Sequence, residues 1–229
     1  MRPRSVRAVL LIAAAGASAR AGSFEVQVEL PQHARIDIEK EGYQTLTVAP
    51  FLRDAAVPAV KDDYSFEREA TRYFERLFGR ETKLKVVDNG DVPLPFASVD
   101  AMTKDQGFWK KLSSDAAADL VLTGQVSFKT SNRSGYVENT YQSSITGRSY
   151  NDRPTFVYRS GATLTIEVIL IEGKSGEILY RDKFLKDRTL EGATADPLQN
   201  FFDLIRSLSS NVLALVTPQK TIATRYLLD

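Results

Sequence analysis

Few residues in this sequence have the types and spacing that catalysis or metal binding needs. His33 is the only histidine and there is no cysteine, so thiolate catalysis, cysteine metal sites and disulfides are excluded. The neighbours of His33 offer no second ligand at helical or hairpin spacing. A Ser–His–Asp triad would need this same histidine, and no Gly-x-Ser-x-Gly elbow occurs. We therefore expect no catalytic residue, no metal site and no cofactor, and we interpret His33 as a surface residue in a turn.

Two weaker chemical patterns remain. Ser175 lies between Gly173 and Gly176, but a tight turn in which both glycines have positive φ explains this pattern. A phosphate-binding loop would also need an upstream glycine and a following helix. Paired carboxylates are typical of acid–base catalysis, and the candidates are Asp62 with Asp63, Asp88 with Asp91, and Asp115 with Asp119. Helix caps and solvated surface explain them more simply, so a carboxylate-based hydrolase is only a remote alternative.

The segment 129–160 has the composition of a binding surface. It is rich in Ser, Asn, Gly, Tyr and Arg and has little aliphatic content. Tyr and Arg are favoured at protein interfaces because they bury area and still offer hydrogen bonds. The partner-binding residues that we predict are Arg133, Tyr136, Tyr141, Arg148, Tyr150, Arg153 and Tyr158. The alternative is an extended β-hairpin whose polar faces only cover the sheet. The polar side chains of the segment 129–160 argue against insertion of this segment into a bilayer.

The elements that must position this segment alternate between strands and helices. Alternating or continuous apolar residues predict strands at 24–30, 34–39, 45–51, 83–88, 119–128, 162–171 and 178–184. Helical spacing predicts amphipathic helices at 65–78, 103–116 and 196–217. We expect Pro50 at the exit of its strand, Gly79 as a helix C-cap, a capping box from Thr103 to Gln106, and an N-cap at Asp196. The order β(β)–α–β–α–β–β–β–α predicts an α/β (α+β) sandwich, with helices packed on a central mixed sheet.

The first 21 residues have the three zones of a secretory signal peptide. Three arginines precede an uncharged run of 12 residues from Ala8 to Ala19, and small residues occupy both positions that signal peptidase reads. A transmembrane anchor is the alternative, but a helix of this length spans only about 18 Å of a core roughly 30 Å thick. We expect cleavage before Gly22, a single domain over 22–229 with a polar insertion at 129–160, and a periplasmic or secreted location.

The charge that remains after cleavage excludes further classes. The shortened chain would carry 26 basic and 29 acidic residues, a net charge of −3. A mildly acidic chain lacks the basic surface that nucleic-acid binding requires. Because there is no cysteine, lipid cannot be attached to one at the N-terminus. We expect no transmembrane span after cleavage, so any attachment to a membrane must be made through a partner protein.

Several short motifs resemble one group of bacterial envelope proteins. They are Thr47-Val-Ala-Pro-Phe51, Lys85-Val-Val-Asp88, the strand from Ala118 to Val126 and the hairpin from Ile171 to Tyr180. The group includes the curli-secretion lipoprotein, the lipoprotein activators of penicillin-binding proteins and the N-terminal domain of the Tol-system propeller protein. The resemblance implies an α/β sandwich with a central mixed sheet. Its motifs are determined by backbone geometry, so they indicate a fold rather than an activity. The chain departs from the group in lacking a lipidated cysteine, and in having Glu172 and Ser175 where Asp and Thr are usual.

These features favour a non-enzymatic accessory protein of the periplasm or cell envelope. We expect it to bind another envelope protein through residues 129–160 and the adjacent edge of the sheet. The alternative is an oligomeric component of an outer-membrane secretion or assembly apparatus.

Overall fold

The computed structural model describes residues 24–57, 64–90, 92–138, 140–142, 144–151, 153–191 and 196–227. They fall into two compact units, which we describe separately. One contains β1 (Phe24–Gln32) and β11 (Gln219–Leu227), which form a two-stranded sheet. The strand β11 was not predicted. The predicted signal peptide at 1–21 lies outside the described residues, and the single domain over 22–229 stays a prediction.

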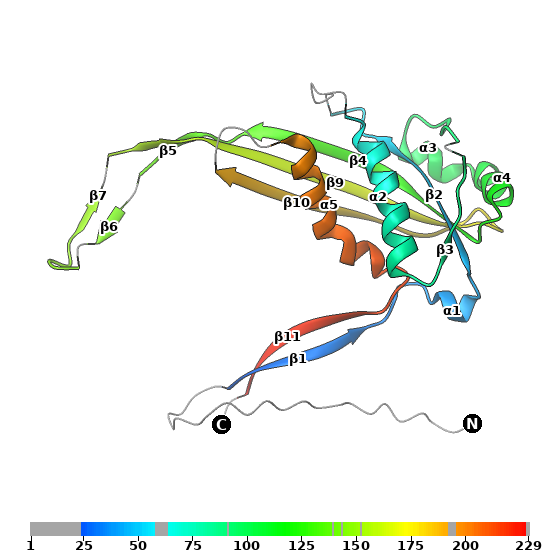
Figure 1. The fold of residues 1–229 in the computed structure, drawn as a ribbon, viewed down its shortest axis with the longest axis horizontal. Helices are drawn as coiled ribbons and strands as arrows, with labels where there is room; N and C mark the ends of the chain where they lie inside the picture. The colour runs from blue at the N-terminus through cyan, green and yellow to red at the C-terminus, as the bar shows by residue number, and fades with distance from the viewer. Residues whose placement is uncertain are drawn as a thin grey trace. The chain divides into compact units, whose positions relative to one another are not determined.

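The second unit is built on a five-stranded mixed sheet with the order β10-β9-β4-β2-β3 (Figure 1). The central strand β4 (Leu120–Asn132) is parallel to β2 (Thr45–Arg53) and antiparallel to β9 (Arg159–Glu172). The edges are β10 (Ile178–Glu191), antiparallel to β9, and the short β3 (Lys85–Val86), parallel to β2. The predicted α/β class with a central mixed sheet is confirmed.

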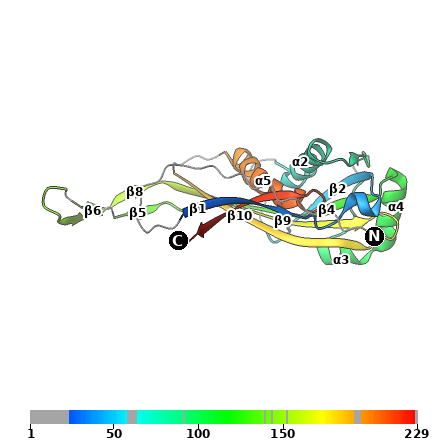
Figure 2. The same ribbon diagram turned by 90° about the horizontal axis from the view of Figure 1, so that it is seen from below.

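Helices cover both faces of this sheet. The helices α2 (Phe66–Glu81) and α5 (Pro197–Leu213) pack on one face, and α3 (Val99–Lys104) and α4 (Gln106–Ala116) on the other (Figure 2). In β9, Leu164 and Ile166 lie in the larger cluster, whereas Ile169 and Ile171 lie in the smaller one. Burial on both faces explains why this strand reads as a nearly continuous apolar run. None of the helices in the described part of the chain is both long and apolar enough to cross a membrane.

Two of the predicted elements are wrong because local capping prevails over periodicity. Residues 34–39 do not form a strand, since Asp37 caps the short helix α1 (Ile38–Glu41) by accepting a hydrogen bond from the Lys40 amide. The predicted helix at 103–116 is two helices. Asp105 interrupts it and accepts a hydrogen bond of 2.9 Å from the amide of Phe108, so α4 begins there and the predicted capping box does not form.

Two residues that we predicted at the ends of a strand and a helix lie inside these elements. Pro50 is in the interior of β2, where the pairing with β4 shifts register between Val48 and Phe51. A missing backbone donor is tolerated at such a bulge. Gly79 lies within α2, which continues to Glu81 and is capped at Thr82. By contrast, Asp196 caps α5 as predicted, accepting a hydrogen bond from the amide of Leu198.

Candidate functional site

The serine in the turn between β9 and β10 has a structural role. The hydroxyl of Ser175 accepts a hydrogen bond of 3.0 Å from the amide of Glu177 and also bonds to the carboxylate of Glu172. The hydrogen bonds from Ser175 and then from Tyr43 lower the pKa of Glu172. Burial and the hydrogen bond to Glu172 raise the pKa of Tyr43 to about 12. Ser175 therefore holds the turn together and is not placed as a nucleophile.

The two glycines of this turn are needed for different reasons. Gly176 has a φ of 71°, as predicted. Gly173 does not have a positive φ, which corrects the prediction. A Cβ on Gly173 would instead lie 2.1 Å from the Oγ atom of Ser113, so close packing against α4 requires glycine there.

Two of the described carboxylates of the candidate acid pairs have structural roles, and the third is exposed on a helix. Asp119 joins the start of β4 to the start of β2, because it accepts hydrogen bonds of 2.9 and 3.0 Å from the amides of Gln44 and Thr45. Asp88 accepts a hydrogen bond from the amide of Gly90 within a turn, and Asp115 is exposed on α4. The remaining members of the pairs, Asp62, Asp63 and Asp91, lie outside the described residues.

The environment of Asp119 makes its contribution to stability depend on pH. Burial raises the pKa of Asp119, but the hydrogen bonds from Gln44 and Thr45 outweigh it, and the pKa lies below the ordinary value of 3.8. Because the folded pKa is lowered, the carboxylate stabilises the fold above the unfolded pKa. This stabilisation is lost as the pH falls through the lower folded pKa.

We predict that Asp119→Ala lowers the free energy of unfolding by about 2–4 kcal/mol at pH 7, since three charge-assisted hydrogen bonds are lost. Asp119→Asn should have a smaller effect. Urea denaturation between pH 7 and pH 2 should show that the deficit shrinks below pH 4. Asp115→Ala serves as the control and should change stability by less than about 0.5 kcal/mol. A deficit in Asp119→Ala that stays constant over this pH range would contradict the account.

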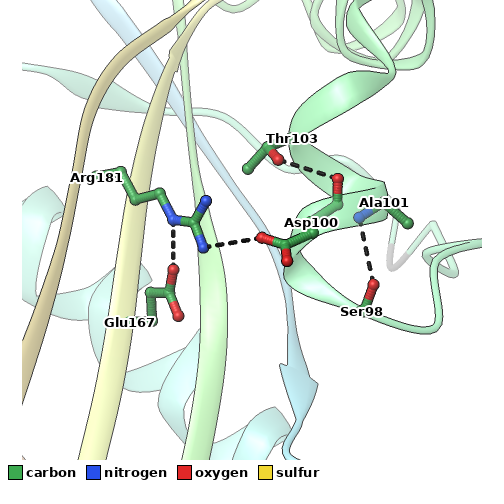
Figure 3. A network of polar contacts seen from close by, with 6 residues as sticks. All are labelled: Ser98, Asp100, Ala101, Thr103, Glu167 and Arg181. Atoms are coloured by element: carbon green, nitrogen blue, oxygen red, sulfur yellow. Dashed lines mark hydrogen bonds and ion pairs between the residues drawn. The ribbon is translucent and has the colours of Figure 1, made fainter.

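A polar network on the face of the sheet that α3 covers is likewise structural (Figure 3). Arg181 of β10 donates to Glu167 of β9 and lies 3.2 Å from Asp100 of α3. Arg181 thereby fastens α3 to the β9–β10 hairpin. In the part of the chain that the structure describes, no three metal-ligating side chains come together.

The predicted binding segment forms a two-stranded extension of the sheet. We call residues 133–158, which connect β4 to β9, the ribbon. Its inner part pairs β5 (Gly135–Val137) with β8 (Thr155–Val157), and its outer part pairs β6 (Thr140–Gln142) with β7 (Ser149–Asn151), both antiparallel. The ribbon continues beyond the end of the sheet and does not fold back over it (Figure 1). The hairpin alternative is therefore correct in its topology but not in the role of covering the sheet.

An exposed row of aromatic rings lies on one face of the ribbon. Tyr136 and Phe156 are directly opposite each other in the ladder, and their ring centroids are 5.1 Å apart. Phe156 and Tyr158 are two residues apart on one strand, and their centroids are 5.0 Å apart. The exposed fractions of the three residues are 75% for Tyr136, 42% for Phe156 and 59% for Tyr158. We call Tyr136, Phe156 and Tyr158 the aromatic row.

The other predicted binding residues differ in their surroundings. Arg133 donates a hydrogen bond of 2.7 Å to Thr189 of β10 and lies 3.8 Å from Asp187, so it braces the base of the ribbon. Tyr141 and Tyr150 are opposite each other in the β6–β7 ladder, but the structure does not describe their side chains. Arg148 and Arg153 are exposed in the outer part of the ribbon. That these residues bind a partner stays a prediction.

Sequence reasoning missed Phe156, the central ring of the row. The composition of the segment pointed to tyrosine and arginine, and Phe156 is not among the predicted binding residues. Its spacing of two residues from Tyr158 was a usable signal, because such residues lie on the same face of a strand. The pairing with Tyr136 depends on the ladder register, which the sequence does not give.

No family model and no curated protein matches this chain. Among solved structures, the PelC dodecamer from Paraburkholderia phytofirmans is similar at 12% identity and a TM-score of 0.35, covering 84% of this chain and 98% of that one. A lipoprotein from Neisseria meningitidis matches at 13% identity and a TM-score of 0.38, covering 74% and 98%. The C-terminal domain of LpoB from Salmonella enterica matches at 14% identity and a TM-score of 0.31, covering 62% and 82%.

These similar structures are bacterial envelope proteins, the class that the sequence motifs resemble. At identities of 12–14% and TM-scores of 0.31–0.38, they assign neither a family nor a function to this chain. The aromatic row is a feature of this chain's own residues.

Proposed function

We propose that this chain is a non-enzymatic accessory protein of the bacterial cell envelope that binds another envelope protein through the aromatic row of its ribbon. The envelope location is supported by the predicted signal peptide and by the motifs that resemble envelope proteins. The single observation that carries the binding role is the exposure of three rings side by side, outside the packed core.

Packing within the ribbon explains only part of this arrangement. Contacts between aromatic rings stabilise a two-stranded ribbon, by about 0.5–1.5 kcal/mol for each pair. That role requires the rings to contact each other, but it does not require Tyr136 to remain 75% exposed. Exposed aromatic side chains that are already held in place lose little conformational entropy when a partner covers them. The aromatic row is therefore suited to a partner with an apolar groove.

The proposal is tested by photo-crosslinking in cells. A photo-reactive phenylalanine analogue is placed at position 136, 156 or 158, one at a time. The matched control is position 64, where Tyr64 is 45% exposed outside the ribbon. We expect one discrete adduct with an envelope protein from the ribbon positions and none from position 64.

A second set of variants measures the strength of binding to the protein identified in that adduct. Tyr136→Ser, Phe156→Ser and Tyr158→Ser together should weaken binding at least about thirtyfold, because buried aromatic side chains dominate interface energies. Tyr64→Ser should bind like the unchanged protein. The proposal is wrong if the ribbon positions give no adduct, or if the triple variant binds as tightly as Tyr64→Ser.

A further inference from the structure

The outer edge of β10 is uncovered among the described residues. This strand of 14 residues pairs with β9 along one side, and no described strand pairs with its other side. From Arg181 to Thr189, every residue except Phe184 is exposed. Such an edge presents a row of backbone donors and acceptors that can pair with another strand.

Charges along the edge limit how it can pair with a second copy. The segment Arg181-Asp-Lys-Phe-Leu-Lys-Asp-Arg188 has the same order of charges in both directions. If two copies pair antiparallel about an axis between Phe184 and Leu185, then arginine faces arginine, aspartate faces aspartate and lysine faces lysine. Like charges directly opposite each other destabilise a ladder, so this register is excluded.

A shift of one residue makes the facing charges complementary. With the two-fold axis at Leu185, Asp182 of one copy faces Arg188 of the other, and Lys183 faces Asp187. Symmetry forms each of these pairs twice. The side chain of Leu185 is 62% exposed in the single chain and would face its own copy at the centre. Pairing in this register therefore removes apolar surface from water and leaves no like charges directly opposite.

The two faces of β10 decide between this register and one with the axis at Phe184. The second register also pairs opposite charges, since it sets Arg181 against Asp187. Each register uses an arginine that is already paired within the chain, Arg181 with Glu167 and Asp100 (Figure 3) or Arg188 with Asp203, so the apolar side chains decide. Phe184 already packs against the larger cluster of the core. Leu185 lies on the same face as Arg181, because alternate residues of a strand share a face. The exposed leucine thus has a partner only with the axis at Leu185.

We propose that two copies of this chain associate through β10, antiparallel and centred on Leu185, so that the two sheets become one continuous sheet. This inference does not depend on the proposed function of the ribbon. The ribbon leaves each sheet at the end where Arg159 of β9 pairs with Glu191 of β10. In such a dimer the two ribbons would lie at opposite ends of the shared sheet, so the dimer would present two separate aromatic rows.

Disulfide trapping tests the register directly, because the chain contains no cysteine of its own. Directly opposite residues of antiparallel strands have Cα atoms about 4.5–5.5 Å apart, within the range of a disulfide. Leu185→Cys should form a disulfide-linked dimer under mild oxidation. Lys183→Cys and Asp187→Cys are matched controls on the same face, and they should not, because each would lie about 13 Å from its own copy.

Charge exchange tests the same interface without oxidation. In sedimentation equilibrium, Lys183→Glu and Asp187→Lys should each weaken the dimer at least about tenfold, and the double variant should restore it. With the axis at Phe184, Lys183 would face Leu185 and the double variant would not restore the dimer. The proposal is overturned if the unchanged chain is a monomer and Leu185→Cys links no faster than its controls. It is also overturned if a dimer exists that the charge exchange leaves unchanged.

Discussion

Gly124→Ala is expected to lower the free energy of unfolding by about 3–5 kcal/mol, since it combines overpacking with backbone strain. A Cβ at this position would lie 1.8 Å from the carbonyl oxygen of Glu167 and 2.9 Å from its carbonyl carbon. Both atoms belong to the backbone of β9, which pairs with β4 in the middle of the sheet. The φ of Gly124 is 159°, which an alanine rarely adopts. Relief of the clash would require the two strands to separate where both faces are buried.

Urea denaturation compares this variant with Gly135→Ala, the matched control at the base of the ribbon. A Cβ on Gly135 would meet no heavy atom within 4 Å. This control should change stability by less than about 0.5 kcal/mol. Equal unfolding midpoints for the two variants would contradict the close approach of β4 and β9 at Gly124.

Trp109→Ala is expected to lower the free energy of unfolding by a similar amount, about 3–5 kcal/mol. The indole is only 1% exposed and packs in the smaller cluster with Met102, Val121 and Ile169. Its Nε1 atom donates a hydrogen bond of 2.8 Å to the carbonyl oxygen of Met102, which joins α4 to α3. The variant removes both the largest side chain of this cluster and the hydrogen bond between the two helices.

Hydrogen exchange identifies the part of the fold that this change loosens. Protection should fall more in residues 99–116 than in α2, because α2 packs on the opposite face of the sheet. Trp109→Phe is the control, since it keeps most of the ring and leaves the Met102 carbonyl without its donor. It should cost about 1–2 kcal/mol. An equal loss of protection on both faces, or a smaller effect for alanine than for phenylalanine, would contradict this role of Trp109.

Periodicity predicted most of the layered fold, because burial determines the pattern of its long elements. The strands β4 and β9 and the helices α2 and α5 follow this rule. It failed where one side chain controls the backbone locally, as Asp37 and Asp105 do by capping helices. The second half of β10 was also missed. Its charged residues do not resemble a strand, and only pairing with β9 extends it to Glu191.

Composition singled out residues 129–160, but it did not show which of their side chains lie together on one face. Residues 129–160 contain the ribbon, although β4 runs on to Asn132 and β9 already begins at Arg159. Which side chains lie together depends on the ladder register that pairs Tyr136 with Phe156. The sequence also does not show which residues a long side chain contacts. Arg133 turns back to Asp187 and Thr189 and is therefore part of the scaffold.

We propose that the ribbon binds a partner while the sheet and its helices provide the stability of the fold. One comparison tests both parts: co-purification from solubilised envelopes of the unchanged chain and of a variant in which residues 134–158 are replaced by a two-residue turn. The thermal transition of each protein is recorded alongside. We predict that the protein identified by crosslinking is lost with the ribbon and that the melting temperature shifts by only a few degrees. Retention of that partner by the shortened chain would contradict the account.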